Sequence, residues 1–126
     1  MRAVDTNVLV RLLARDDPKQ LVAAEDFVGP GAWISHLVLM ETVWVLDAVY
    51  GVGRDAMADG VEMLLDHETL VVDGADVVRD ALSTFRKVSR VSFSDCLILH
   101  VARKAGHSPL GTFDRALGKA PGAQRL

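Results

Sequence analysis

The stretch "RAVDTNVLVRLLARDD", residues 2–17, contains the change of periodicity that decides the fold class. A short extended apolar run ends at Val4, and apolar residues then recur at helical spacing from Val8 to Leu13. Asp5 stands at the junction of the two patterns. The stretch therefore predicts a strand that leads directly into a helix.

The same alternation of strand and helix signals continues along the chain. Strands are predicted in "AWIS" (32–35), "TLVVDG" (69–74), "SPLGTFD" (108–114) and, as a possible short last strand, "AQRL" (123–126). Helices are predicted over 18–28, from a Ser35 cap to Gly51, over 54–66, over 75–88, and from a Ser94 cap to Gly106. Alternating strands and helices imply parallel pairing through right-handed crossovers. The predicted fold is α/β, a three-layer α/β/α sandwich with a mainly parallel central sheet.

Length and composition favour one soluble domain over residues 1–126. The chain has 126 residues and 50% hydrophobic content, enough to bury a core of its own. Its single cysteine, Cys96, excludes an internal disulfide and fits a reducing, cytoplasmic setting. The histidines lack the paired spacing of a zinc site. No uncharged apolar segment approaches the roughly 20 residues of a membrane span, so no membrane association is expected.

Charge is distributed unevenly along the chain. Residues 1–78 hold 5 Lys/Arg and 14 Asp/Glu, a balance of −9, whereas residues 79–126 hold 9 Lys/Arg and 3 Asp/Glu, a balance of +6. This asymmetry permits one part to bind a polyanion while carboxylates gather in another. A folded surface on which the two halves intermix is an equally good interpretation.

Three acidic residues occur at predicted element ends. Asp5 and Asp114 lie at the C-terminal ends of strands, where parallel α/β folds form their sites, although each is equally explained as a turn or capping residue. Asp95 lies in the first turn of its helix, where the helix dipole alone favours an acid.

Glu41 differs from these three because it lies well inside an apolar helix. The residues three and four positions away, which share its face, are Leu37, Val38, Trp44 and Val45. This pattern predicts burial, which for a carboxylate costs about 3 kcal/mol or more unless a partner compensates the charge. Two interpretations remain open: Glu41 points into a metal-binding acidic pocket, or it faces solvent or pairs with a basic residue.

A hard divalent cation would let four carboxylates share one pocket. Without a cation they would repel one another. Mg²⁺ and Mn²⁺ prefer oxygen ligands, and the absence of a Cys/His cluster argues against zinc. The sequence therefore predicts Mg²⁺ or Mn²⁺ at a pocket of acidic residues.

Four motifs resemble those of the PIN domain and, more closely, of the VapC-type toxins of bacterial toxin-antitoxin pairs. They are "VDTNVLVRLL" (4–13), "LMETVWVL" (39–46), "FSDCLILHVA" (93–102) and "LGTFDRAL" (110–117), in the family's order and spacing. The resemblance covers essentially the whole chain. Each motif is weak by itself, but the four together at this length are specific.

The resemblance implies a metal-dependent endoribonuclease that hydrolyses RNA phosphodiester bonds. Its catalytic and metal-binding acids correspond here to Asp5, Glu41, Asp95 and Asp114; Thr6 and Asn7 would orient Asp5, and Thr112 would assist Asp114. It also implies a Mg²⁺ or Mn²⁺ cofactor, a cognate antitoxin that covers the acidic groove, and a homodimer. Many relatives carry a further acid where this chain has Ser92, a difference that bears on how many ions are held and how tightly.

Residues outside the four acids suggest further contacts. Arg86, Lys87, Arg90 and Arg115 are candidates to hold flanking phosphates, although a solvated basic face explains any one of them equally simply. The apolar surfaces of the first two helices and of the helix around Trp44 are candidates for protein contacts.

Three competing interpretations are weaker. A PIN fold that has lost catalysis and only binds antitoxin or RNA would not explain four acids in place. A receiver-like signalling domain would need its phosphoacceptor at a strand end, and neither Asp55 nor Lys104 is predicted there. The glycine motif "GVGRDA" (51–56) follows a helix and not a strand, so it does not indicate a dinucleotide site.

Overall fold

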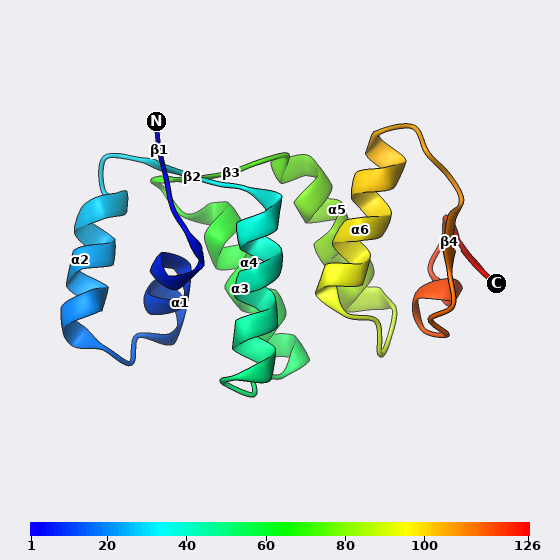
Figure 1. Cartoon of the computed structure of the whole chain (residues 1–126), viewed down its shortest axis with the longest axis horizontal. Coiled ribbons are helices and arrows are strands. Elements are labelled where there is room, and N and C mark those ends of the chain that lie inside the picture. Colours follow the sequence, from blue (N-terminus) through cyan, green and yellow to red (C-terminus); the bar gives the residue numbers. More distant parts are fainter. The chain divides into compact units, whose positions relative to one another are not determined.

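The computed structural model describes residues 1–126 as two compact units, residues 1–75 and residues 76–126. The strands and helices follow one another in the predicted order, with two helices after each of the first three strands (Figure 1). The elements before residue 75 are β1 (Arg2–Ala3), α1 (Thr6–Ala14), α2 (Pro18–Val28), β2 (Ala32–Ile34), α3 (His36–Ala48), α4 (Arg54–Asp66) and β3 (Leu70–Val72). The others are α5 (Ala75–Lys87), α6 (Phe93–Lys104), β4 (Leu110–Thr112), the short 3-10 helix η1 (Leu117–Lys119) and β5 (Ala123–Arg125).

The first unit is built on a parallel sheet with strand order β1-β2-β3. Ala32 of the central strand is paired with Arg2 on one side and Leu70 on the other. Beyond the strands, the backbone N–H of Val4 donates to the Trp33 carbonyl at 3.1 Å. Because the three strands are parallel, their C-terminal ends lie at the same edge of the sheet, and both α1 and α3 begin there.

The helices of the first unit pack through small and branched apolar side chains. α1 lies between α2 and α3 (Figure 1). It buries Leu9, Val10 and Leu12, which recur at helical spacing, while Asn7 on another side of the helix is exposed. α2 begins at Pro18 and is capped by Asp17. Proline favours the first position of a helix because its backbone angle already fits the helix.

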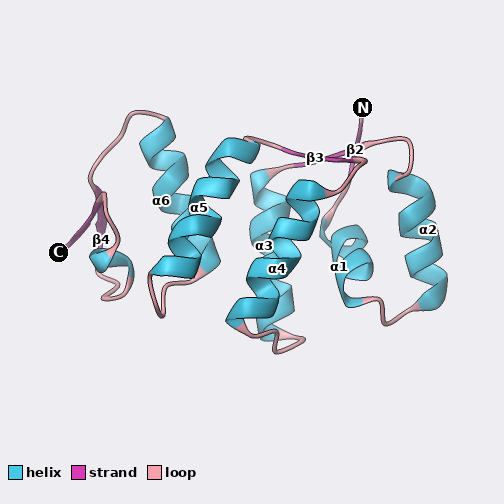
Figure 2. Cartoon of the chain, turned by 180° about the vertical axis from the view of Figure 1, so that it is seen from behind, coloured by secondary structure: helices cyan, strands magenta, loops and turns pink.

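The second unit holds α5 and α6 side by side, together with the parallel pair β4-β5 (Figure 2). Phe85 and Phe93 meet edge to face with ring centroids 5.9 Å apart. Thr84 Oγ1 and His100 Nε2 share a hydrogen bond of 2.7 Å between the two helices. Burial of the His100 ring, which is only 9% exposed, lowers the pKa of its imidazole below the ordinary value.

The structure confirms the predicted α/β fold with parallel strands and corrects one detail of it. The cap of α6 is Ser92, not Ser94: the Ser92 hydroxyl accepts a hydrogen bond from the Asp95 backbone N–H at 3.0 Å. The helix begins at Phe93, so the Asp95 backbone N–H has no acceptor within the helix and donates to the Ser92 hydroxyl. Ser94 already lies inside the first turn. None of the helices has the length and apolar character required to cross a bilayer. The single domain stays a prediction.

Candidate active site

Asp5 is fixed by the start of α1. It follows β1 and serves as the helix cap, with its Oδ1 accepting from the Asn7 backbone N–H at 2.9 Å. Its second oxygen has no hydrogen-bond partner in the protein and the residue is exposed. Thr6, the first residue of the helix, is buried. One oxygen of Asp5 is therefore oriented by the fold and the other is available to a ligand.

Glu41 lies on the exposed side of α3, so the prediction that it is buried was wrong. The helix is capped by Ser35, as predicted, and buries Leu39, Thr42, Val43 and Leu46 on its other side. On the side of Glu41, Leu37 is 80% exposed and Trp44 is 63% exposed. A segment that is apolar on every side does not indicate which side of the helix is buried. Here the packing of α3 against α1 and α4 decides it. The Glu41 carboxylate has no hydrogen bond or ion pair with the protein.

Asp95 occupies the third position of α6 and is half-buried. Its backbone N–H is held by the Ser92 hydroxyl, but its carboxylate makes no return bond to Ser92. Both of its oxygens are therefore without a protein partner. A carboxylate at this position also gains from the partial positive charge of the helix N-terminus.

Asp114 follows β4 and begins the turn that leads to η1. The Thr112 hydroxyl accepts a hydrogen bond from the Asp114 backbone N–H at 3.0 Å. The Asp114 Oδ1 in turn accepts from the Leu117 backbone N–H at 2.7 Å. Thr112 thus contacts the residue that it was predicted to assist, and Asp114, like Asp5, keeps one oxygen free.

The four predicted acids are divided equally between the two units. Asp5 and Glu41 belong to the first, and Asp95 and Asp114 belong to the second. Within neither unit do three or more His, Cys, Asp or Glu side chains gather closely enough to hold a metal ion. The free oxygens are hard donors of the kind that Mg²⁺ and Mn²⁺ prefer, so the donor set fits these ions. The convergence of the two pairs stays a prediction.

Comparison with known proteins decides the family. A family model described as PIN domain matches residues 2–123. The chain belongs to the PIN domain family. The resemblance drawn from the four sequence motifs is thereby confirmed at the level of the family.

A curated protein and a solved structure illustrate what this PIN domain is similar to. It is 27% identical over 124 residues to a VapC ribonuclease of Aquifex aeolicus (strain VF5), an alignment that covers 94% of this chain and 91% of the relative. The crystal structure of Mycobacterium tuberculosis VapC20, a Sarcin-Ricin loop cleaving toxin, is 22% identical, with 94% of this chain and 92% of that chain covered and a TM-score of 0.43.

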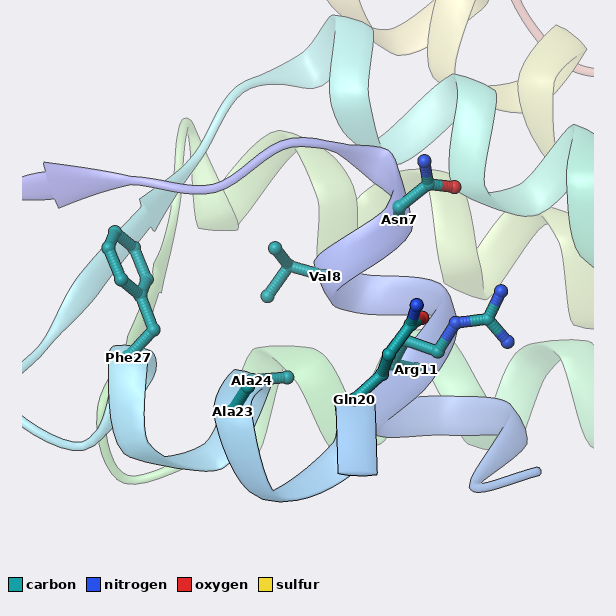
Figure 3. A pocket seen from close by; sticks show the side chains of 7 residues that line it. All are labelled: Asn7, Val8, Arg11, Gln20, Ala23, Ala24 and Phe27. Atoms are coloured by element: carbon teal, nitrogen blue, oxygen red, sulfur yellow. The ribbon is translucent and has the colours of Figure 1, made fainter. Parts of the chain in front are cut away.

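A pocket opens between α1 and α2 of this PIN domain, beside Asn7 (Figure 3). Asn7, Val8 and Arg11 line it from α1, and Gln20, Ala23, Ala24 and Phe27 line it from α2. Phe27 closes one end and is covered by the Arg2 guanidinium, 4.6 Å from the ring centroid. The walls are mostly apolar and hold no acid.

Arg11 connects this pocket to a polar cluster that the sequence did not indicate. Its Nη1 donates to Asp16 at 2.8 Å and to the Tyr50 hydroxyl at 3.2 Å, and Tyr50 donates to Asp16 at 3.1 Å. Burial acts to raise the pKa of Asp16, but the hydrogen bonds from Tyr50 and Arg11 outweigh it and hold that pKa below its ordinary value. The cluster connects the end of α1 to the end of α3 within the first unit.

Proposed function

We propose that this PIN domain is a metal-dependent endoribonuclease that hydrolyses RNA phosphodiester bonds and acts as the toxin of a toxin-antitoxin pair. Family membership over residues 2–123 carries the proposal, because all four family acids are present at their motif positions. The relative named VapC ribonuclease, similar over nearly the full length of both chains, supports the same reaction.

The state of the carboxylates supports metal binding. Asp5 and Asp114 each direct one oxygen to a backbone N–H and leave the other free, while Glu41 and Asp95 leave both free. When bound, Mg²⁺ or Mn²⁺ supplies a water of lowered pKa and neutralises charge on the scissile phosphate. In the proposal, Asp5, Glu41 and Asp95 hold the ion, and Asp114 completes the pocket or orients the attacking water.

The partners belong to the same proposal. A cognate antitoxin would cover the acidic groove, and two copies of the chain would form a homodimer. The exposed side of α3 around Leu37 and Trp44 offers apolar area for one of these contacts. The proposed setting is the cytoplasm, where a buried cysteine thiol such as that of Cys96 stays reduced.

Asparagine substitutions test the assignment because they remove a charge and keep the cap. Asn is as good a helix cap as Asp, so Asp5→Asn should fold normally. Cleavage of RNA in Mg²⁺ or Mn²⁺ should fall roughly 100-fold or more, since changes to residues that only support metal ligands already cost 10- to 100-fold. Asp95→Asn should have the same effect, and chelation by EDTA should abolish cleavage by the wild type.

A matched control is Asp26→Asn, which removes an exposed acid of α2 far along the chain from every motif. It should cleave like the wild type. Full cleavage by both Asp5→Asn and Asp95→Asn would contradict the assignment. A wild-type protein that binds RNA without cutting it in any divalent ion would favour the binding-only PIN fold.

A further inference from the structure

The second unit holds a pocket with three basic side chains on its wall. The lining residues are Val88, Ser89, Arg90, Asp114, Arg115, Ala116 and Lys119. They come from the loop between α5 and α6 and from the turn between β4 and η1, which are far apart in the sequence. The loop and the turn thus bring Arg90, Arg115 and Lys119 to one pocket with Asp114, one of the four proposed active-site acids.

The charge of this wall is suited to an anion. Three cations and one carboxylate give it a net charge of +2. All three basic side chains are exposed, and none of them forms an ion pair within 4 Å. The Ser89 hydroxyl adds an uncharged donor. Unpaired cations around one hollow can therefore donate hydrogen bonds to phosphate oxygens without first breaking an ion pair within the protein.

The backbone holds Arg90 in an unfavourable conformation. Its φ is 67°, in the left-handed region that residues other than glycine and asparagine rarely adopt. Glycine would form this turn with less strain, so the backbone conformation does not explain why an arginine stands at position 90. Residues in sparsely populated backbone conformations are enriched at functional sites.

The opposite wall is fixed by close packing of η1 on β5. A Cβ atom added at Gly118 would lie 2.8 Å from the Cβ of Arg125, so only glycine permits this approach. Lys119 directly follows Gly118, and the Lys119 backbone N–H donates to the Ala116 carbonyl at 3.2 Å. The main chain that carries Lys119 is thus held in place beside Asp114.

We propose that Arg90, Arg115 and Lys119 form a subsite for an RNA phosphate next to the one that is cleaved at Asp114. The inference rests on the proposed function and extends it from the reacting bond to the neighbouring part of the substrate. A single-stranded RNA presents a phosphate at every nucleotide, so a strand with one phosphate at the acids places another within reach of the cations. These contacts hold the backbone and read no sequence.

The test measures the affinity for a short fluorescein-labelled single-stranded RNA, by fluorescence anisotropy in Mg²⁺ over a series of salt concentrations. Every protein carries Asp5→Asn, so that the RNA stays uncut. Arg90→Gln, Arg115→Gln and Lys119→Gln are made singly and together. Lys19→Gln is the matched control, because it removes one exposed positive charge of α2 outside the pocket.

The plot of log affinity against log salt concentration has a negative slope. Each lost phosphate contact should make this slope less steep by about 0.7, and the triple variant should make it less steep by about 2. The control should keep the parent slope. A triple variant with the slope of the control would overturn the proposal, and so would a parent protein that binds no RNA. Binding of inorganic phosphate that the triple variant loses while it keeps RNA affinity would assign the pocket to free phosphate and not to RNA.

Arg90→Gly adds a readout that a structural arginine would not give. Glycine relieves the left-handed backbone, so the midpoint of thermal unfolding should rise, while RNA affinity should fall as in Arg90→Gln. A lower midpoint with unchanged affinity would show a structural arginine. A different result would contradict the proposed function: a wild-type protein that cleaves no RNA in the presence of divalent ions.

Discussion

The two units of this PIN domain differ in what they offer an RNA substrate. Residues 1–75 hold 5 Lys/Arg and 13 Asp/Glu, a net charge of −8, whereas residues 76–126 hold 9 Lys/Arg and 4 Asp/Glu, a net charge of +5. Each nevertheless supplies two of the four family acids. In the proposed function both units would contribute metal ligands, and the pocket lined by Arg90, Arg115 and Lys119 belongs to the second unit.

The helix starts of the two units also differ in how they hold an acid. In the first unit the acid is itself the cap, so Asp5 directs one oxygen to the Asn7 backbone N–H. In the second, Ser92 is the cap and Asp95, three residues later, keeps both oxygens free. An acid near a helix start thus keeps one free oxygen where it is itself the cap and two where another residue is the cap.

The largest predicted effect tests whether the two units unfold as one domain. Leu97→Ala removes a fully buried side chain of the second unit and should lower the free energy of unfolding by about 2 to 5 kcal/mol. Both tryptophans, Trp33 and Trp44, lie in the first unit. If the chain is one domain, their fluorescence should report the same shifted denaturation midpoint as far-UV circular dichroism.

Ile98→Ala is the control, because Ile98 adjoins Leu97 and is 43% exposed. It should change the free energy of unfolding much less. A tryptophan transition that Leu97→Ala leaves in place, while the circular dichroism transition moves, would show that the units unfold separately and would end the single-domain prediction.

A smaller effect is expected at the cap of α6. Ser92→Ala leaves the Asp95 backbone N–H without its partner and should cost about 1 kcal/mol of stability by urea denaturation. Ser92→Asp should keep the cap and the stability, because aspartate caps as well as serine does. Ser94→Ala should change little, and a larger loss from Ser94→Ala than from Ser92→Ala would contradict the assigned cap.

The smallest predicted effect is a pH dependence in the second unit. His100 has a pKa lowered by burial, so the unfolded chain binds its proton more readily than the folded one. Its contribution is present above the unfolded pKa of about 6.5 and is lost as the pH falls from there through the folded pKa. His100→Gln should flatten the curve of urea midpoint against pH in this window, whereas exposed His107→Gln should not.

Much of the fold could be predicted from the sequence because local signals agree with it. The strand-to-helix switch after Val4 and the cap at Ser35 occur as predicted. The predicted strands are all present but shorter, because pairing requires a neighbour in register and alternation alone does not supply one.

The candidate site was harder to predict because it depends on contacts between distant segments. Glu41 is exposed because the buried side of α3 is decided by the neighbours of that helix, about which a uniformly apolar segment carries no information. Ser89 and Lys119 were missed, although Arg90 and Arg115 were suggested by charge. No periodicity relates the loop after α5 to the turn before η1, so the pocket that they share is visible only in three dimensions.

Capping by Asp5 and Asp114 has a consequence for the energetics of ion uptake. Their carboxylates are already immobilised by the backbone N–H groups of Asn7 and Leu117, so folding has removed their torsional freedom before an ion arrives. Glu41, with a longer side chain and no partner, retains that freedom and forfeits up to roughly 2 kcal/mol when it is ordered. Of the proposed ligands, Glu41 and Asp95 are therefore the ones whose carboxylates an ion would have to order on binding.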